Sequence, residues 1–398
     1  MLKMTRKRIL ICAANYLPGY KSGGPIRSVA NLITHLGSSL DFYVITRDRD
    51  HGDDRAYEGI TPGKWYEVGN ARVLYCSHVT PSVLRKAFHE VRPDLIHLGS
   101  FQDTFTVFAV LLRRIGAFGD TPVVLAPRGE FSPGAMAIKR TKKRIYRYSA
   151  KFLGLHEGLL WQAMGPREKQ EILAAAPARR LDPDSIFVAR SITEHPVSSA
   201  PHPAKQSGSV KLVFVSRVSE KKNLHFVLEL LDRIPGRIEL DIYGPVTEKD
   251  AAYWEKCQAL LSSLPENIAV HYHGSIEPSA VPRVLREHHF FVLPTRGENY
   301  CHAAVESFLS GTPVVLSNET PWTELRLACS GFDIPLNDPA AWIAVLQQCV
   351  DMDQSTYNLF LNGAKEYSRR FSVEEAVGQH RAMFDSALAA KPERFGKH

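Results

Sequence analysis

The chain has 398 residues, of which 44% are hydrophobic and 23% are charged, so it is globular and not intrinsically disordered. A chain of this length is too long to fold around one ordinary hydrophobic core, so we expect two domains. No run approaches the roughly 20 apolar residues of a membrane-spanning helix. The net charge of +7 fits anionic partners such as nucleotides, phospholipids or nucleic acid, and it does not choose among them.

The six cysteines are scattered, with no CxxC pair and no Cys/His spacing of a zinc site. We therefore expect a reducing cytoplasm and no structural metal. The N-terminus starts with basic residues, but its apolar run, residues 9–14, is shorter than a signal peptide needs. We expect a first strand there, and a cytoplasmic protein that is either soluble or peripheral at the inner face of the membrane.

Apolar runs alternate with helical spacing through the first half of the chain. We expect strands at residues 8–14, 41–46, 71–75, 94–98, 123–126, 159–162 and 186–189. We expect helices at residues 25–36, 81–91, 101–115, 137–153 and 166–174. The stretch 47–57 is crowded with Asp, Arg, Gly and His, and we expect a mobile loop there. The alternation predicts a parallel sheet covered by helices.

Three residues of this half stand where a parallel sheet binds ligands. Gly23 and Gly24 follow the first strand and precede Pro25, which suits a first helical position. Their lack of side chains lets a ligand approach the backbone, although such a pair is more often only a turn. His97 lies at a strand end. A histidine there is more often hydrogen-bonded structure than a catalyst, and we keep His97 as a candidate for lining an acceptor cleft.

Residues 139–151 carry seven Lys or Arg and no acid, interleaved with Ile145, Tyr146 and Tyr148. Such a helix can dock on an anionic membrane face or receive a lipid-phosphate acceptor. An ordinary solvated basic surface is an equal alternative, because a clean apolar face is not obvious in the sequence.

The second half of the chain also alternates between apolar runs and stretches with helical spacing. After a Pro- and Ser-rich stretch at residues 194–209, we expect strands at 210–215, 238–243, 268–271, 290–293, 313–316 and 331–334. Helices are expected from residue 223 to 231 or beyond, and at 301–309, 339–351, 355–371 and 373–389. Gly244 and Gly274 follow two of the strands, and their backbone groups are candidates for contact with a nucleotide base.

Two cations follow the first strand of this half. Arg217 stands at its end, and Lys222 comes five residues later at the start of a helix. Both side chains can reach a diphosphate from these positions. The alternative is a pair of surface cations, which we would prefer if the acidic pair of the next paragraph were absent.

The stretch 290–317 contains strand, loop, helix, turn and strand, with Glu298 in the loop and Glu306 in the helix. Both carboxylates can then border one cleft at the carboxyl edge of a parallel sheet. The amides of Asn299, Tyr300 and Cys301 would lie at the helix N-terminus, where unpaired N–H groups attract phosphate. Each acid alone would be an ordinary helix-start or helix-surface residue, but the pair in this setting favours function.

Glu298, seven intervening residues and Glu306, followed by the sequence SGTPVV at 310–315, resemble the E-x7-E signature of retaining glycosyltransferases of the GT-B fold, glycosyltransferase family 4 (glycosyl transferases group 1). The resemblance covers nearly the whole chain and is strongest at 210–331. It implies an α/β fold with two doubly wound Rossmann-like domains facing each other across a cleft. The implied parts are an acceptor domain at 1–195, a linker at 196–209, a donor domain at 210–372 and a helix at about 373–398 that completes the first domain.

The resemblance also implies roles for four side chains. The first Glu of the motif, here Glu298, contacts the transferred sugar, and the second, here Glu306, contacts the ribose of the donor. The matching Arg and Lys, here Arg217 and Lys222, hold the donor pyrophosphate and stabilise the departing nucleotide. In the resulting mechanism, the incoming hydroxyl attacks from the side of the leaving group, whose phosphate takes the proton.

In the first domain the resemblance is looser. A glycine-rich loop after strand one faces the donor phosphates and the acceptor site in the family, which matches Gly23 and Gly24. Many members carry a His near the loop 127–130, where this chain has Arg128 instead, on the acceptor side. Glu168 lies near a position where the family often has an acid.

The implied activity is a retaining, metal-independent hexosyl transfer, of EC class 2.4, from a UDP- or GDP-sugar to a saccharide or lipid-linked acceptor. The resemblance places it in cell-surface polysaccharide, lipopolysaccharide or glycolipid biosynthesis. We expect no metal or other cofactor, because we see no Asp-x-Asp that would hold a metal. One alternative is a nucleotide-sugar epimerase on the same fold. Another is a non-catalytic protein that binds nucleotide or nucleic acid, for which the sequence shows no recognition motif.

Overall fold

The computed structural model describes residues 6–137, 140–194 and 200–390. Within the ranges expected above, residues 1–5 of the first domain, Lys139 of the basic stretch, residues 195–199 around the start of the linker, and residues 391–398 of the C-terminal segment lie outside the described residues. The chain divides into two compact units, each described by itself below. Unit 1 comprises residues 1–192 and 373–398, and unit 2 comprises residues 193–372.

Unit 1 is built on a sheet with the order β3-β4-β2-β1-β5-β6-β7-β8. Its strands are β1 Lys7–Cys12, β2 Leu40–Arg47, β3 Trp65–Val68, β4 Ala71–Cys76, β5 Leu95–Leu98, β6 Val123–Leu125, β7 Leu160–Ala163 and β8 Ile186–Val188. Its helices are α1 Gly24–Leu36, α2 Pro81–Val91, α3 Thr104–Arg114, α4 Pro133–Ala137, α5 Arg140–Phe152, α6 Pro166–Ala175 and α13 Val373–Ala389. Neighbouring strands pair in parallel, except that β3 runs antiparallel to β4.

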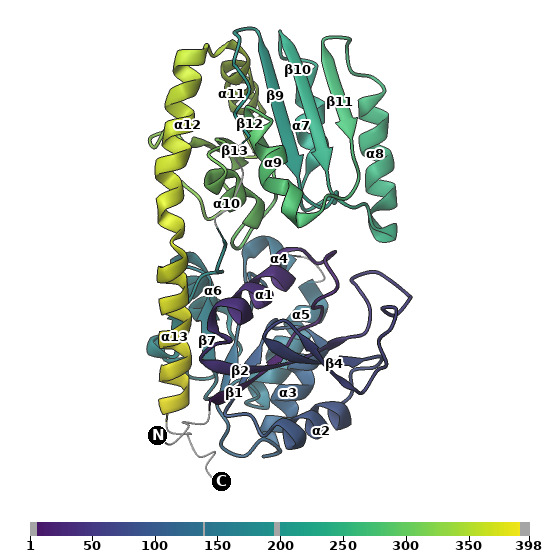
Figure 1. Cartoon of the computed structure of the whole chain (residues 1–398), viewed down its shortest axis with the longest axis vertical. Helices are drawn as coiled ribbons and strands as arrows, with labels where there is room; N and C mark the ends of the chain where they lie inside the picture. Colours follow the sequence, from purple (N-terminus) through teal and green to yellow (C-terminus); the bar gives the residue numbers. More distant parts are fainter. Residues whose placement is uncertain (1–5, 138–139, 195–199, 391–398) are drawn as a thin grey trace. The chain divides into compact units, whose positions relative to one another are not determined.

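Unit 2 has a parallel sheet with the order β11-β10-β9-β12-β13-β14, of which Figure 1 shows β9, β10 and β11 side by side. Its strands are β9 Ser209–Val215, β10 Arg237–Tyr243, β11 Ile268–Tyr272, β12 Phe290–Leu293, β13 Val314–Ser317 and β14 Gly331–Ile334. Its helices are α7 Leu224–Leu231, α8 Ala251–Leu261, α9 Val281–Arg286, α10 His302–Leu309, α11 Pro339–Asp351 and α12 Gln354–Ser368. The strands β12 and β13 are buried along their whole length, as expected of a parallel sheet with helices on both faces.

The two sheets share one arrangement. In unit 1 the chain builds β1, β2 and β4 outward on one side and then returns to β5 beside β1. In unit 2 it builds β9, β10 and β11 and then returns to β12 beside β9. The strand order therefore reverses between β1 and β5 and between β9 and β12. In doubly wound sheets, ligands bind outside the carboxyl ends of the strands at such a reversal.

The last helix belongs to unit 1. α13 packs against α1, and the Phe384 ring lies 6.4 Å from the ring of Phe42 on β2. The Arg190 guanidinium donates to the Glu375 carboxylate at 2.6 Å, and its backbone carbonyl lies 3.0 Å from Nε2 of His380. The end of the chain thus fills the core next to its beginning.

The expected fold class is confirmed, and most expected strands lie within two residues of the observed ones. The short edge strand β3 and the helices α8 and α9 were not predicted. In the stretch 47–57, expected to be a mobile loop, Asp48 and Asp50 are only 1% and 5% exposed, so these two residues are packed against the rest of unit 1. Both carboxylates are buried against backbone and side-chain donors, which a loop exposed to solvent would not provide.

Residues 200–208, expected to lie in a linker, pack on unit 2. The Lys205 ammonium is buried and donates to the carbonyls of Gln206, Val350 and Met352, each at 2.9 Å. The last two carbonyls lie at the end of α11, where unpaired acceptors favour a cation. This segment is therefore fixed to the unit that follows it.

The six cysteines are free thiols. Within residues 6–137, 140–194 and 200–390, no helix combines the length and the apolarity that crossing a membrane requires.

Candidate functional site

The centre of the candidate site in unit 2 is an ion pair. Lys222 donates from Nζ to Oε1 of Glu298 at 2.7 Å, and Thr295 donates from Oγ1 to the same oxygen at 2.9 Å. Lys222 follows β9 and Glu298 follows β12, so the pair lies where the strand order reverses. The backbone between them is tied as well, because the Arg296 amide donates to the Lys221 carbonyl at 2.8 Å.

Glu298 remains ionised at neutral pH. Burial alone would raise its pKa, but the charges of Lys222 and Lys221 and the hydrogen bonds from Lys222 and Thr295 lower it overall. The side chains of Lys222 and Glu298 are 20% and 11% exposed, so solvent screens their attraction only in part. The Glu298 carboxylate and the Lys222 ammonium are thus fixed by their hydrogen bonds, and both remain partly accessible to a ligand.

Arg217 stands next to this pair, two residues beyond the end of β9. It is near enough to Lys221 to lower that ammonium's pKa further, after the larger effect of burial. Its Nε atom is buried and has no hydrogen-bond partner. The local backbone is set by Gly244, whose φ of 147° and close approach to the Ser216 carbonyl leave no room for a Cβ atom.

Gly244 and Gly274 were predicted to offer backbone groups to a nucleotide base. The structure pairs them with each other, since the Gly244 amide donates to the Gly274 carbonyl at 2.7 Å. The Gly244 carbonyl accepts from the Tyr272 hydroxyl at 3.0 Å. Gly244 thus shapes the loop that carries Arg217, and the roles of Gly244 and Gly274 in donor binding stay predictions.

The turn into α10 follows Glu298. Cys301 caps the helix in a left-handed conformation, with φ of 61°, and its carbonyl accepts from the amides of Ala304 and Val305 at 3.1 Å each. The Cys301 thiol is buried, which raises its pKa to about 12 and makes it a poor nucleophile. The Tyr300 ring is buried against Trp322, and the backbone amides of this turn lie at the N-terminus of α10, where they suit an anionic ligand.

Glu306 lies inside α10, as its spacing from the strand predicted, and it is 5% exposed. Asn299 lies in the turn before the helix and is half-buried. The donor-contact roles of Asn299, Tyr300, Cys301 and Glu306 remain predictions.

In unit 1, the glycine loop after β1 is held by an aspartate. The Asp50 carboxylate accepts from the amides of Tyr20 and Lys21 at 2.8 and 3.0 Å. Gly23 follows with φ of 63° and starts α1, and no atom lies within 4 Å of the place a Cβ would take. Asp48 and Asp50 form an Asp-x-Asp triplet that the prediction did not consider, and the protein's own donors occupy both carboxylates.

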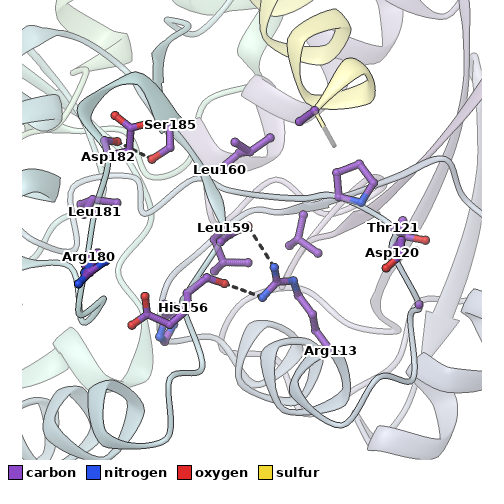
Figure 2. A pocket seen from close by; sticks show the side chains of 16 residues that line it. Arg113, Asp120, Thr121, His156, Leu159, Leu160, Arg180, Leu181, Asp182 and Ser185 are labelled. Atoms are coloured by element: carbon purple, nitrogen blue, oxygen red, sulfur yellow. Dashed lines mark hydrogen bonds between the residues drawn. The ribbon is translucent and has the colours of Figure 1, made fainter. Parts of the chain in front are cut away.

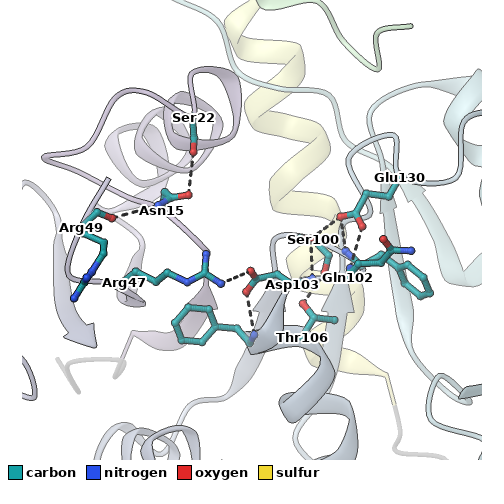
Figure 3. A network of polar contacts seen from close by, with 11 residues as sticks. Asn15, Ser22, Arg47, Arg49, Ser100, Gln102, Asp103, Thr106 and Glu130 are labelled. Atoms are coloured by element: carbon teal, nitrogen blue, oxygen red, sulfur yellow. Dashed lines mark hydrogen bonds and ion pairs between the residues drawn. The ribbon is translucent and has the colours of Figure 1, made fainter. Parts of the chain in front are cut away.

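A polar network lies at the carboxyl ends of the unit 1 strands (Figure 3). The Glu130 carboxylate, after β6, accepts from the Ser100 hydroxyl at 2.5 Å and from the amides of Phe101 and Gln102 at 2.9 and 3.0 Å. Burial raises its pKa, although these donors and Lys143 work against the rise. The loop from β5 into α3 is thus shaped by Glu130, which lies in a different loop, after β6.

Further along the same edge, Arg47 donates to the Asp103 carboxylate at 2.9 Å, and Asn15 links the loops after β1 and β2 through the Arg49 carbonyl at 3.3 Å. Asp103 also caps α3 by accepting from the Phe105 amide at 2.9 Å. The Arg47–Asp103 and Asn15–Arg49 contacts join residues from three strand ends, and sequence reasoning missed them because their partners lie 56 and 34 residues apart.

Arg128, named as an acceptor-side candidate, adopts a left-handed conformation with φ of 53° and is half-buried. Burial lowers its pKa to about 10, while the Glu168 carboxylate raises it in part. Glu168 holds the same turn, since it accepts from the Gly129 amide at 2.5 Å and from the Met164 amide at 2.7 Å. Arg128 therefore places a partly buried cation near the Glu168 carboxylate, at the carboxyl edge of β6.

His97, the other acceptor-side candidate, is 1% exposed. Its Nε2 donates to Oε1 of Gln162 at 2.8 Å, and Gln162 donates in turn to the Ala189 carbonyl at 2.8 Å. Burial lowers the His97 pKa to about 4, so the ring is neutral near pH 7. This burial argues against an acceptor contact and favours the structural interpretation.

A cavity of about 470 Å³ lies at the opposite edge of the unit 1 sheet (Figure 2). Its lining comes from the segments before β6, β7 and β8, at the amino ends of these strands. Arg113 on its wall is engaged by the carbonyls of Glu157 and Gly158 at 2.8 and 3.0 Å. Because ligands of doubly wound sheets bind at the carboxyl ends, we do not assign the donor or acceptor to this cavity.

Residues 199–362 match the family model described as Glycosyl transferases group 1. This range contains Arg217, Lys222, Glu298 and Glu306. The match and the fold make the protein a glycosyltransferase, an enzyme of EC class 2.4. No curated protein sequence matches the chain significantly.

Solved structures show the GT-B fold over nearly the whole chain. HepE of Anabaena, crystallised with UDP and glucose, is 15% identical with a TM-score of 0.70, over 96% of this chain and 100% of that one. The sucrose-phosphate synthase of Thermosynechococcus elongatus is 15% identical with a TM-score of 0.74 over the same shares. WaaG, a glycosyltransferase involved in lipopolysaccharide biosynthesis, is 13% identical with a TM-score of 0.67, over 94% of this chain and 98% of that one.

Proposed function

We propose that this glycosyltransferase moves a sugar from a nucleotide-diphosphate sugar to a hydroxyl of a saccharide or lipid-linked acceptor, with retained anomeric configuration and without a metal. The observation that carries the proposal is the Lys222–Glu298 pair, 2.7 Å apart at the reversal of strand order in unit 2. A nucleotide-sugar donor needs both a cation for its diphosphate and an acceptor of hydrogen bonds for its sugar hydroxyls, and this pair holds both at one place.

The cations of unit 2 would bind the diphosphate. Cleavage of the sugar–phosphate bond leaves negative charge on the leaving phosphate, and preorganised charges that face it lower the barrier. Arg217 and Lys222 can supply these charges, with the amides before α10 as further donors. Two side-chain cations thereby take the place that a divalent metal has in other transferases, which is why we propose metal independence.

The two glutamates would each bind a different part of the donor. Glu298 stays ionised and exposes part of its carboxylate, so it suits the sugar hydroxyls, which donate hydrogen bonds. Glu306 would accept from the ribose hydroxyls. The acceptor hydroxyl would attack from the face of the leaving group and pass its proton to the departing phosphate, so neither Glu need act as a nucleophile.

For the nucleotide we place UDP first and GDP second. HepE has been crystallised with UDP and with UDP-glucose, which supports a uridine donor for this chain too. Unit 1 would bind the acceptor, and Arg128 would supply a cation that could meet a phosphate on it. The likeness to WaaG supports a place in lipopolysaccharide or other cell-surface glycan synthesis, in the cytoplasm or peripheral at the inner face of the membrane.

The experiment is a thermal-unfolding panel of the full chain with UDP, GDP, ADP, UDP-glucose and GDP-mannose, each with and without EDTA. A ligand at a hundred times its Kd stabilises by about 2.7 kcal/mol through RT ln(1 + [L]/Kd). Stabilisation by one diphosphate and its sugars that survives EDTA would support the proposal and identify the base. Stabilisation that EDTA abolishes would refute metal independence, and no stabilisation by any member would refute the donor assignment.

A Glu306→Gln variant tests the site within the same panel. We expect it to unfold at nearly the wild-type temperature without ligand and to lose most of the stabilisation by the donor. Transfer at the wild-type rate by this variant would contradict the assignment. Analysis of the products by NMR then decides the anomeric configuration, and recovery of an epimerised nucleotide sugar without acceptor would replace transfer by epimerisation.

A further inference from the structure

Helix α5 carries an apolar stripe that faces solvent. Ile145, Tyr148 and Phe152 are 61%, 70% and 78% exposed. Their spacing of three and four residues places them within an arc of about 60° on the helix surface, at about 100° per residue. The opposite side of α5 is buried, since Ala150 is inaccessible and the Tyr146 ring lies 5.4 Å from that of Phe101. The helix is therefore anchored in unit 1 by one face and presents the α5 stripe outward.

Exposed cations flank the α5 stripe on both sides. Lys142 lies on one side of it, and Arg144 and Lys151 lie on the other, at about 100° per residue. The helix contains no Asp or Glu over its 13 residues. The stripe and its flanks thus combine apolar side chains with uncompensated positive charge, which is the composition of an interfacial helix.

The apolar surface continues beyond α5. Leu153 follows the helix and is 48% exposed, and its carbonyl accepts from Arg114 at 3.0 Å. This bond brings the end of α3 beside the end of α5, where Ile115 is 78% exposed. Five of the large exposed apolar side chains of the described chain thus lie along α5, just after it and beside its end at the end of α3.

We propose that the α5 stripe and its flanking cations dock unit 1 on an anionic membrane surface. The apolar side chains would enter the boundary between headgroups and acyl chains, and Lys142, Arg144 and Lys151 would lie at the level of the anionic headgroups. Among residues 6–137, 140–192 and 373–390 the stripe is left exposed to water, and the positive flanks complement an anionic lipid surface. The proposal does not depend on the transfer reaction, because none of these residues belongs to the donor site.

The test is co-sedimentation of the full chain with vesicles of 30% phosphatidylglycerol and 70% phosphatidylcholine, and with vesicles of phosphatidylcholine alone, at 50, 150 and 500 mM NaCl. We expect binding to the anionic vesicles that weakens as salt rises, and at least tenfold weaker binding to phosphatidylcholine. Removing the cations in a K142A/R144A/K151A variant should weaken binding by about a hundredfold. Removing the apolar tips in an I145S/F152S variant should weaken it by about tenfold or more and leave the salt dependence unchanged.

The matched control is an L327S/L359S variant, which removes two equally exposed apolar side chains of unit 2 and should bind as the wild type does. Melting temperatures of all variants confirm that each is folded. Equal binding to both vesicle types, or wild-type binding by I145S/F152S, would overturn the proposal. Salt-sensitive binding of a 20-nucleotide RNA that depends on the cations but not on Ile145 and Phe152, without vesicle binding, would assign the surface to nucleic acid instead.

Discussion

The carboxyl edges of the two sheets differ although the sheets share one strand order. In unit 2, Arg217, Lys222 and Glu298 leave the ends of β9 and β12 with opposite charges held close and partly open to solvent. In unit 1, the carboxylates at the equivalent edge, Glu130 and Asp50, are engaged by the protein's own amides. The charged groups at the unit 2 edge are therefore partly exposed, whereas these carboxylates at the unit 1 edge hold the shape of loops.

This difference teaches how a shared fold separates two tasks. A nucleotide diphosphate has constant chemistry, so a few fixed charges on short loops can bind it. If unit 1 binds the acceptor, as proposed above, the loop shapes that Glu130 and Asp50 hold would select it, since acceptors vary from one enzyme to another. The predictions below test this contrast, from the largest expected effect to the smallest.

The largest effect should come from breaking the charge pair of unit 2. We expect a Lys222→Ala substitution to lower kcat/KM by about a thousandfold, because it removes a cation facing the leaving phosphate and leaves the Glu298 carboxylate without its main partner. Initial rates with the donor identified in the thermal panel measure this. The counterpart in unit 1, Arg128→Ala, should leave the Kd for the donor unchanged and lower only transfer.

A Lys256→Ala variant serves as the control, since Lys256 pairs with Glu229 at the surface of unit 2 at 3.4 Å and should be dispensable. If Lys222→Ala kept more than a third of the wild-type kcat/KM, or if Arg128→Ala weakened donor binding as much as Lys222→Ala, the contrast between the edges would be wrong.

The next effect concerns the two glycines beside the unit 2 edge. A Cβ at position 244 would collide with the Ser216 carbonyl, whereas one at position 274 meets nothing within 4 Å. We expect Gly244→Ala to lower the free energy of unfolding by about 3 kcal/mol and to displace Arg217, weakening donor binding. Gly274→Ala should cost only about 1 kcal/mol, from its φ of 72°.

Urea unfolding of both variants, with donor titrations of each, makes the measurement. Equal losses of stability in the two would show that the contact with Ser216 is not what requires glycine at position 244.

The smallest effect concerns the aromatic core of unit 1. His156 is 1% exposed, both ring nitrogens lack hydrogen-bond partners, and burial together with Arg113 lowers its pKa to about 3. The unfolded chain, with a histidine pKa of about 6.5, takes up the proton first, so stability falls as pH drops from about 6.5 toward 3. A His156→Phe variant should gain about 1 kcal/mol at pH 7 and about 2 kcal/mol more at pH 5.

Unfolding by urea at pH 7 and pH 5 checks this, with His78→Phe as the control, because this substitution makes the same chemical change at an exposed position. If the His156→Phe protein lost as much stability at pH 5 as the wild type, the pKa of His156 would not differ between the folded and the unfolded chain.

The sequence by itself determined most of the strands and helices, all but β3, α8, α9 and the short α4 among the elements named above, and the local setting of the motif. The strand at 290–293, the helix with Glu306 and the turn with Glu298 follow from periodicity and from Gly and Pro within thirty residues, which is the range that local propensity controls. The sequence also singled out Arg217 and Lys222 as candidate site residues, since cations that follow a buried strand can be recognised from the sequence alone.

Only the tertiary structure decided which of these groups meet. Lys222 and Glu298 are 76 residues apart, and they pair because β12 lies beside β9, an adjacency that no local pattern encodes. The same holds for Glu130 with the amides after β5 and for Asp50 with those after β1. The α5 stripe became visible once the packing of Tyr146 and Ala150 showed which face of the helix is covered. In each case the partner comes from a distant loop or element, and its identity depends on how the chain is packed in three dimensions.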